Sequence, residues 1–284
     1  MGPDTVYLGD CLTVLPQLPD GAFQMVYLDP PFNTGRVQRR TTTRTALDPA
    51  GDRVGFRGAR HATVVEGGLA YPDAYQDYLG FLGPRLREAW RVLAPTGTLY
   101  VHLDYREVHH VKVMLDAEVG RERFLNELIW AYDYGARARR RWPAKHDNIL
   151  VYVKDPSAYW FDAAEVDREP YMAPGLVTAE KASRGKLPTD VWWHTIVSPT
   201  GKEKTGYPNQ KPEAILRRMM QASSRPGDRV LDCFAGSGTT GAVAQQLGRR
   251  FVLCDDNPEA VDVMRRRLTR GPVEYRVAAS PAMG

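Results

Sequence analysis

Residues 230–241 read VLDCFAGSGTTG, an apolar strand followed by a glycine-rich bend and the start of a helix. Glycine lets a ligand approach the backbone closely, so this bend is a candidate cofactor site. Gly236, Gly238 and Gly241 also satisfy the GxGxxG pattern of dinucleotide-binding folds, although that pattern alone is weak evidence. A P-loop is not indicated, because no Gly-Lys-Ser/Thr sequence follows. The stretch predicts a nucleotide-type cofactor, and a nicotinamide or flavin dinucleotide stays open.

The next apolar strand, residues 251–254, ends in Asp255-Asp256-Asn257-Pro258. An acidic residue at this point of a parallel sheet can accept hydrogen bonds from a ribose diol. Asp256 is also a candidate N-cap for a helix that begins near Pro258, so we assign the ribose to Asp255. This assignment suits either kind of nucleotide cofactor.

Short β-rich runs alternate with amphipathic helical stretches at both ends of the chain, which is the pattern of a parallel sheet covered by helices. Pro95-Thr-Gly97 predicts a turn between a helix over residues 78–93 and a strand over residues 99–103. We predict one domain over residues 1–284, with an α/β fold and a doubly wound, mostly parallel sheet that contains one antiparallel pair. Further strands are expected at residues 6–8, 25–28, 127–132 and 148–153, and a further helix at residues 106–117.

The tetrapeptide Asp29-Pro30-Pro31-Phe32 follows an expected strand, at the sheet edge where open α/β folds bind ligands. The exocyclic amine of adenine or cytosine is a poor nucleophile, because its lone pair is delocalised into the ring. The Asp29 carboxylate and a carbonyl of Pro30-Pro31 can accept its two protons where positive charge develops during methylation. Phe32 can stack on the base, an interaction worth about 1 to 3 kcal/mol. The tetrapeptide is equally compatible with an ordinary turn at a strand end.

Two stretches interrupt the alternation of strands and helices. Residues 34–72 are rich in Arg, Thr and Gly, and residues 155–205 mix Pro, Gly, charged and aromatic residues. Long connections without regular structure are usually functional or disordered. We expect residues 34–72 and residues 155–205 to be insertions on the loop edge of the sheet, where a macromolecular substrate would bind. Within the second region, Trp192-Trp193 is either a DNA contact or a packing anchor.

Basic residues gather at positions 36–44 and 137–145, close to the motifs described above. Runs of charge are usually solvated faces, and this interpretation is favoured for each cluster taken alone. Their place beside the motifs points instead to contacts with DNA phosphates, which supply salt-dependent affinity without reading sequence. The predicted DNA-contacting residues are Arg36, Arg39, Arg40, Arg139, Arg140, Arg141 and Lys145.

In their order along the chain, these motifs resemble the amino-group DNA methyltransferases of the beta arrangement, which modify adenine N6 or cytosine N4. In that family a DPP(Y/F) motif precedes an FxGxGT cofactor motif, with the target-recognition segment between them, and the same order occurs here. The resemblance extends over nearly the whole chain. Further matching segments are Gly9-Asp10-Cys11, Gly97-Thr-Leu-Tyr-Val-His102, Lys145-His-Asp-Asn-Ile-Leu-Val-Tyr152 and Thr205-Gly-Tyr-Pro-Asn-Gln-Lys-Pro212, in which Asn209 replaces the more usual Thr.

The resemblance implies a Rossmann-like methyltransferase fold with circularly permuted motif order and S-adenosylmethionine as cofactor. The implied cofactor residues are Phe234, Gly236, Gly238 and Thr239 along the bend, Asp255 on the ribose, Asp10 and Cys11 near the adenine, and Lys211 near the methionine end. A lysine suits this cofactor, which carries a carboxylate and lacks the pyrophosphate of a dinucleotide. The implied catalytic residues are Asp29, Pro30, Pro31 and Phe32.

The resemblance also implies a substrate and partners. The substrate is a base flipped out of double-stranded DNA, with residues 34–72 as a loop insertion that faces DNA and residues 155–205 as the target-recognition region. In the family an Asp that opens the catalytic motif is more frequent with adenine N6, so cytosine N4 is the alternative. Relatives are often homodimers, and a cognate restriction enzyme is a further candidate partner.

The composition limits the class of protein. A net charge of +4 fits a polyanionic partner without identifying one. Cys11, Cys233 and Cys254 show no CxxC spacing, which argues against a disulfide framework or a zinc site and favours the reducing cytoplasm. His102 alternates with apolar neighbours, so we expect a hydrogen-bonded core or site-edge residue, and we predict no metal. No segment approaches the roughly 18 apolar residues of a membrane span, so no membrane partner is expected.

Three other functions stay open at this point. A dinucleotide oxidoreductase explains Gly236–Gly241 and leaves Asp29–Phe32 unexplained. Methyltransferases that act on RNA or on protein glutamine also use a planar-amide turn of this kind, but they usually place the cofactor motif first. A DNA-binding module without catalysis is disfavoured by the intact motifs.

Overall fold

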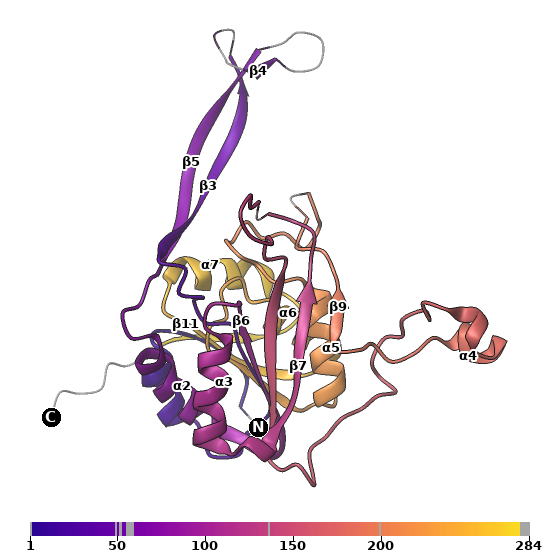
Figure 1. The fold of residues 1–284 in the computed structure, drawn as a ribbon. Coiled ribbons are helices and arrows are strands. Elements are labelled where there is room, and N and C mark those ends of the chain that lie inside the picture. The colour runs from indigo at the N-terminus through magenta and orange to yellow at the C-terminus, as the bar shows by residue number, and fades with distance from the viewer. Residues whose placement is uncertain are drawn as a thin grey trace, which may run out of the picture.

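The computed structural model describes residues 2–48, 50, 53–54, 60–135, 137–198 and 200–278, with the backbone alone for residues 37–45, 53–54, 61 and 63–72. Within this part of the chain, nine strands form one central sheet in the order β12-β1-β11-β10-β2-β6-β8-β7-β9 (Figure 1). These strands are β1 (Asp4–Leu8), β2 (Phe23–Leu28), β6 (Leu93–Leu103), β7 (Phe124–Ala131), β8 (His146–Val153), β9 (Val191–Trp193), β10 (Arg229–Asp232), β11 (Arg250–Asp255) and β12 (Val273–Val277).

All neighbouring strands of this sheet run parallel except β8, which runs antiparallel to both β6 and β7. The mostly parallel α/β fold is therefore confirmed. The antiparallel element is one strand with two antiparallel neighbours, where the sequence predicted a single antiparallel pair.

Helices cover both faces of the sheet. On one face lie α1 (Cys11–Val14), α2 (Tyr78–Val92) and α3 (Val108–Val119), and on the other lie α5 (Glu213–Ser223), α6 (Thr239–Leu247) and α7 (Pro258–Arg267). Strand β2 supplies both cores by alternation, because Met25 and Tyr27 pack with α5–α7 while Val26 and Leu28 pack with α1–α3. Among the described residues, no helix combines the length and the apolar character needed to cross a membrane.

The middle of the sheet contains a topological switch point. The chain leaves β10 toward β11 on one side, and it leaves β2 toward β6 on the other, although β10 and β2 are neighbours. Open α/β sheets bind ligands outside the carboxyl ends of the strands at such a point. The loops after β2, β10 and β11 meet there.

Strand β6 begins earlier than the sequence predicted. Pro95-Thr-Gly97 lies inside the strand, because pairing with β2 already starts at Leu93 and shifts register between Phe23 and Met25. Gly97 is required at this irregularity, since a Cβ there would lie 2.7 Å from Leu93 Cδ1 and 3.0 Å from the Gln24 carbonyl oxygen. The predicted turn is thus a β-bulge.

The prediction of a loop over residues 34–72 is wrong in its secondary structure. Strands β3 (Arg36–Leu47) and β5 (Arg60–Asp73) pair antiparallel along their whole length. The short strand β4 (Arg53–Val54) pairs antiparallel with β5. Figure 1 shows this β-ribbon projecting far from the central sheet. The threonines between residues 41 and 45 favour strands, which outweighed the missing alternation of polar and apolar residues. The side chains of Arg39 and Arg40 lie outside the described part of the structure.

Residues 155–205 have little regular structure. They contain a 3₁₀ turn (Pro174–Leu176), the short helix α4 (Ala179–Arg184) and strand β9. Figure 1 shows α4 on an arm that extends away from the sheet. Strand β9 returns to the sheet and pairs parallel with β7 at its edge.

Candidate active site

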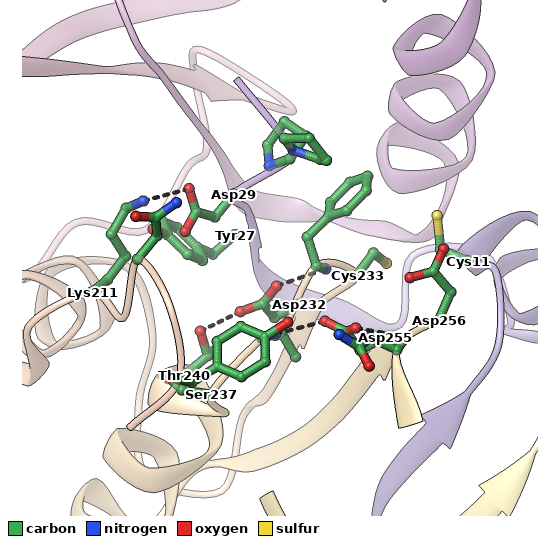
Figure 2. Close-up of a pocket in the computed structure, with 18 of the residues that line it drawn as sticks. Cys11, Tyr27, Asp29, Lys211, Asp232, Cys233, Ser237, Thr240, Asp255 and Asp256 are labelled. Carbon is green, nitrogen blue, oxygen red and sulfur yellow. Dashed lines mark hydrogen bonds and ion pairs between the residues drawn. The ribbon is translucent and has the colours of Figure 1, made fainter. Parts of the chain in front are cut away.

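A cavity opens at the carboxyl ends of β1, β2, β10 and β11 (Figure 2). It brings together motifs from both ends of the chain, as the parallel sheet predicted. The predicted residues that line it are Asp10, Cys11, Asp29, Pro30, Pro31, Phe32, Lys211, Phe234, Gly236, Thr239 and Asp255. Gly238 instead turns the chain into α6 with a φ of 72°, and a Cβ there would lie 2.7 Å from Met264 Cγ.

The glycine-rich bend is held against the next strand by one carboxylate. Gly236 N–H donates to Asp255 Oδ2 at 2.7 Å, and Asn257 N–H donates to Asp255 Oδ1 at 3.0 Å. Burial raises the pKa of Asp255 to about 6. Asn257 caps α7 by accepting from Glu259 N–H, so the N-cap alternative for Asp256 is wrong. Asp256 lines the cavity beside Asp255 and is a second candidate for the ribose.

Asp232, at the end of β10, fixes the start of the same bend. Its carboxylate accepts from Phe234 N–H at 3.0 Å and from the Thr240 hydroxyl at 2.5 Å. The side chain is buried, and burial raises its pKa to about 7. Asp232 was not among the predicted site residues, although its place at the end of a buried strand is a usable signal.

Asp10 is held by an arginine that the sequence analysis missed. Its Oδ1 accepts from Leu12 N–H at 2.7 Å, which caps α1, and its Oδ2 accepts from Arg85 Nη2 at 2.5 Å. The Arg85 guanidinium also lies 4.0 Å from the centre of the Phe81 ring. Arg85 falls on the apolar stripe of α2 beside Leu82, and a charge on that stripe is the signal that would have identified it.

The tetrapeptide Asp29–Phe32 is held in place on its carboxyl side. The Tyr78 hydroxyl donates to the Pro31 carbonyl at 2.7 Å, so the Pro30 carbonyl is the better candidate for the second acceptor. Asn33 follows with a φ of 54°, and its amide joins two other segments. It donates to Glu107 Oε1 at 2.8 Å and accepts from Tyr75 N–H at 2.8 Å. These contacts fix where Asp29 and Phe32 enter the cavity.

Asp29 itself forms an ion pair with Lys211. Asp29 Oδ1 lies 2.9 Å from Lys211 Nζ, and the two side chains are 17% and 9% exposed. The same ammonium lies 4.6 Å from the centre of the Phe32 ring. Lys211 therefore contacts two of the four predicted catalytic residues, in addition to lining the predicted cofactor site.

A buried polar network lies behind Phe32. The His102 ring is 5.8 Å from the Phe32 ring, and its Nδ1 is 2.8 Å from the Tyr27 hydroxyl. His102 Nε2 lies 3.2 Å from Asp147 Oδ2, and the Tyr132 hydroxyl donates to Asp147 Oδ1 at 2.9 Å. The expectation of a hydrogen-bonded residue at the site edge is thus confirmed for His102. Within the described residues, no group of His, Cys, Asp or Glu could hold a metal ion.

The predicted DNA-contacting arginines Arg139, Arg140 and Arg141 are exposed in the connection from β7 to β8. This connection leaves β7 at the same sheet edge as the cavity, because β7 runs in the same direction as β6. Lys145 closes its base by donating to the Gly135 carbonyl at 3.1 Å. Arg36 is exposed at the start of the β-ribbon.

The two adjacent tryptophans have different environments. Trp192 is 6% exposed, and its indole N–H donates to the Thr189 carbonyl at 2.7 Å, so it is a packing anchor. Trp193 is 77% exposed on the edge strand β9. The packing alternative therefore holds for Trp192, and a DNA contact by Trp193 stays a prediction.

Residues 23–266 match the family model described as DNA methylase, the N6/N4 methyltransferases. The chain belongs to this family. Family membership confirms the resemblance found in the motifs and identifies a DNA-modifying enzyme. It also decides against the dinucleotide oxidoreductase.

Individual relatives of this DNA methylase support the assignment. DNA adenine methyltransferase YhdJ of Escherichia coli (strain K12) is 30% identical over 274 residues, which cover 93% of this chain and 82% of the relative. Type II methyltransferase M.HpaI of Haemophilus parainfluenzae is 29% identical over 261 residues, which cover 91% and 72%. The fold is similar to the crystal structure of the M1.HpyAVI-SAM complex, with a TM-score of 0.58, 20% identity and coverage of 93% and 98%.

A DNA methylase needs a methyl donor, and the cavity has the groups that S-adenosylmethionine would need. Gly236 lines the cavity with a φ of 49°, a conformation that favours glycine, and a Cβ there would lie 3.1 Å from the Tyr207 ring. Lys211 offers a nearly buried cation to the methionine carboxylate, and Asp255 and Asp256 offer acceptors to a ribose. The donor set therefore fits this cofactor.

The raised pKa of Asp232 predicts a pH-dependent stability. Folding favours the protonated acid, whose stabilising effect is complete below its ordinary pKa of 3.8 and is lost as pH rises through about 7. Asp232→Asn keeps the acceptor for Phe234 N–H and cannot ionise. We therefore expect this variant to gain stability relative to wild type as pH rises across that range.

Urea unfolding at several pH values measures this difference. Asp262→Asn, an exposed position on α7, is the control and is expected to follow wild type at every pH. A constant difference between Asp232→Asn and wild type from pH 4 to pH 8 would contradict the assignment of a neutral, buried acid.

Proposed function

We propose that this DNA methylase transfers a methyl group from S-adenosylmethionine to adenine N6 of a base flipped out of double-stranded DNA. The observation that carries this proposal is the convergence of two motifs at one point of the cavity. Asp29, from the catalytic tetrapeptide, and Lys211, from the Gln-Lys-Pro segment, meet at 2.9 Å beside the glycine-rich bend. An acceptor for an amine and a partner for the cofactor carboxylate thus lie side by side.

Asp29 and the Pro30 carbonyl accept hydrogen bonds from the two protons of the target amine. This pulls the lone pair out of the ring and stabilises the positive charge that develops on nitrogen. Phe32 stacks on the base and offsets part of the few kcal/mol that base extrusion costs. When bound, S-adenosylmethionine supplies an electrophilic sulfonium methyl group. The target nitrogen would take this methyl group in one displacement that releases S-adenosylhomocysteine, and it would then lose one proton to solvent, without a covalent enzyme intermediate.

The remaining cavity residues hold the cofactor. Phe234, Gly236 and Thr239 border it along the bend, Gly238 shapes the bend from behind, and Asp10 and Cys11 lie at the adenine end. Each Asp255 oxygen accepts one backbone N–H and has a second lone pair, which accepts a hydrogen bond from the ribose. Asp256 offers a further carboxylate. Arg85 holds Asp10 in place and is a positioning residue.

Adenine is the proposed target because the relative YhdJ is named a DNA adenine methyltransferase and the motif opens with Asp29. We expect genomic DNA incubated with the protein and S-adenosylmethionine to contain N6-methyladenine. Digestion to nucleosides followed by mass spectrometry measures this product. A signal from N4-methylcytosine without N6-methyladenine would overturn the choice of base and leave the chemistry at Asp29 unchanged.

Substitution of Asp29 tests the catalytic role. We expect Asp29→Asn to lower methyl transfer at least about 100-fold, because one preorganised acceptor at a charged centre contributes about 10² to 10³ in rate. Cofactor binding should not weaken, since Asp29 contacts the amine. Transfer of labelled methyl groups to DNA gives the rate and calorimetry gives the affinity. Asp262→Asn is the matched control, and near-normal turnover of Asp29→Asn would refute the role.

DNA binding is assigned to the cavity edge of the sheet. The exposed connection with Arg139, Arg140, Arg141 and Lys145 projects from this edge, and the β-ribbon that carries Arg36, Arg39 and Arg40 starts there. The region over residues 155–205 is proposed to read the target sequence, with the exposed Trp193 as a candidate contact. We also propose that the protein forms a homodimer and acts beside a cognate restriction enzyme. The proposed location is the cytoplasm, and the buried, free thiols of Cys11, Cys233 and Cys254 are consistent with it.

Neutralising three arginines together tests the phosphate contacts. We expect Arg139→Gln, Arg140→Gln and Arg141→Gln, combined in one variant, to weaken binding to all duplex sequences alike. The slope of log affinity against log salt should flatten by about 0.9 for each lost phosphate contact. Fluorescence anisotropy at several salt concentrations measures both effects.

A charge-matched control removes three exposed arginines that lie outside this connection and do not line the cavity, Arg87, Arg121 and Arg225. This control variant is expected to keep the wild-type slope. Equal slopes for wild type and the first triple variant would identify its arginines as a solvated face.

A further inference from the structure

Lys211 lies between the proposed base site and the proposed cofactor site. Its ammonium contacts Asp29 Oδ1 at 2.9 Å and lies 4.6 Å from the centre of the Phe32 ring, as Figure 2 shows for the ion pair. In the proposed function, Asp29 and Phe32 are the two side chains that contact the flipped base. Lys211 therefore occupies both of them in this structure. The lysine side chain is 9% exposed, so solvent screens the pair only weakly.

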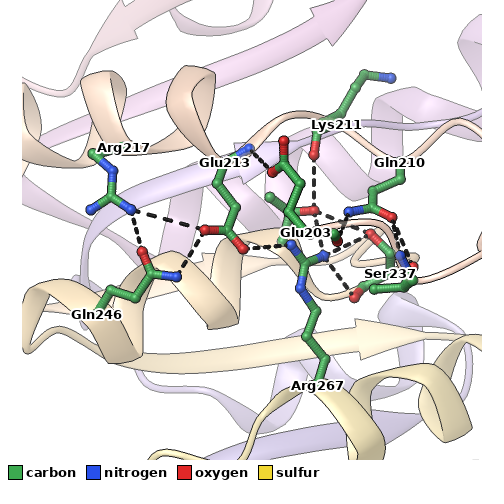
Figure 3. A network of polar contacts seen from close by, with 10 residues as sticks. Glu203, Gln210, Lys211, Glu213, Arg217, Ser237, Gln246 and Arg267 are labelled. Carbon is green, nitrogen blue, oxygen red and sulfur yellow. Dashed lines mark hydrogen bonds and ion pairs between the residues drawn. The ribbon is translucent and has the colours of Figure 1, made fainter. Parts of the chain in front are cut away.

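The main chain of Lys211 is held by a hydrogen-bond network in which its side chain takes no part (Figure 3). The Lys211 carbonyl accepts from the Thr239 hydroxyl at 3.1 Å, and Arg267 Nη1 donates to the same hydroxyl oxygen at 2.9 Å. Arg267 also donates to Glu213 Oε1 at 2.9 Å, and Glu213 N–H donates to Glu203 Oε2 at 2.9 Å. The flexible four-carbon stem can therefore change partner without moving the glycine-rich bend.

The ion pair opposes methyl transfer as long as it persists. It occupies one Asp29 oxygen, and it places a positive charge next to the nitrogen that becomes positive as the methyl group arrives. Like charges in a poorly screened site repel strongly, and the attraction of Asp29 for the nitrogen is reduced by the same lysine. Another anion must take Lys211 before Asp29 acts at full strength.

We propose that Asp29 and the carboxylate of S-adenosylmethionine compete for the Lys211 ammonium, so that cofactor binding releases Asp29 and Phe32 to receive the base. This inference rests on the proposed function, which assigns the cofactor carboxylate to Lys211. The coupling between the two sites is reciprocal, because any group that shifts Lys211 toward one partner changes the affinity of the other site by the same factor. The base site is thus completed by the cofactor, and unproductive capture of a base is reduced.

The competition is tested by cofactor-product binding in the absence of DNA. We expect Asp29→Asn to bind S-adenosylhomocysteine about five-fold more tightly than wild type, since the competing charge is gone. The affinity for 5′-methylthioadenosine, which lacks the carboxylate, should stay the same in both proteins. In a Lys211→Met background, Asp29→Asn should no longer change the affinity for S-adenosylhomocysteine. Calorimetry measures all of these affinities.

Asp262→Asn, at an exposed position on α7, is the control, because it removes a negative charge without removing a partner of Lys211 or a residue of the cavity. It is expected to give no tighter binding. An unchanged or weaker affinity of Asp29→Asn for S-adenosylhomocysteine, with normal binding by wild type, would overturn the competition alone. Failure of wild type to bind S-adenosylhomocysteine would overturn the cofactor assignment as well. If Lys211→Met does not fold, the comparison of the two ligands in Asp29→Asn still decides.

Discussion

The parallel pairing of β10 with β2 is the constraint on which the site depends. In this register Leu231 lies beside Val26 and Asp232 beside Tyr27, so residues about two hundred positions apart end their strands at the same height. The loops that follow are the glycine-rich bend and the tetrapeptide Asp29–Phe32, which is proposed to be catalytic. A shift by one residue would reverse which side chains face each helical layer, and the alternation of buried residues along β2 prevents it. Core packing therefore determines where Asp29 meets the glycine-rich bend, to which Lys211 is anchored through Thr239.

Short-range patterns in the sequence predicted most of this arrangement, because the strands end in motifs with distinctive residue types. Asp29–Phe32 and Phe234–Thr239 were placed correctly at one sheet edge without any contact information. The sequence did not predict the partner of Lys211, since a lysine near a carboxylate is found only when the chain is folded. Arg85 and Tyr78 were missed for the same reason, because each acts on a segment that lies far from it in sequence.

The β-ribbon was mispredicted for a different physical reason. A two-stranded ribbon that projects from a domain has no buried face over most of its length, so its sequence need not alternate between polar and apolar residues. Its threonines carried the strand signal instead. The prediction of a turn at Pro95-Thr-Gly97 was also wrong. A bulge and a turn use the same residue types, and only the pairing with β2 distinguishes them.

Two buried carboxylates lie beside the glycine-rich bend, although burying a charged group costs folding free energy. Burial raises the pKa of both Asp232 and Asp255, which means that their charged forms lower the free energy of unfolding. Each acid accepts backbone N–H groups that a glycine-rich bend leaves exposed, and no apolar side chain can do that. The bend must remain open to a ligand and cannot satisfy these donors by forming a helix or a strand. Carboxylates at the ends of β10 and β11 hold the bend rigid from behind while its other side stays available, and this explains their position directly under the cavity.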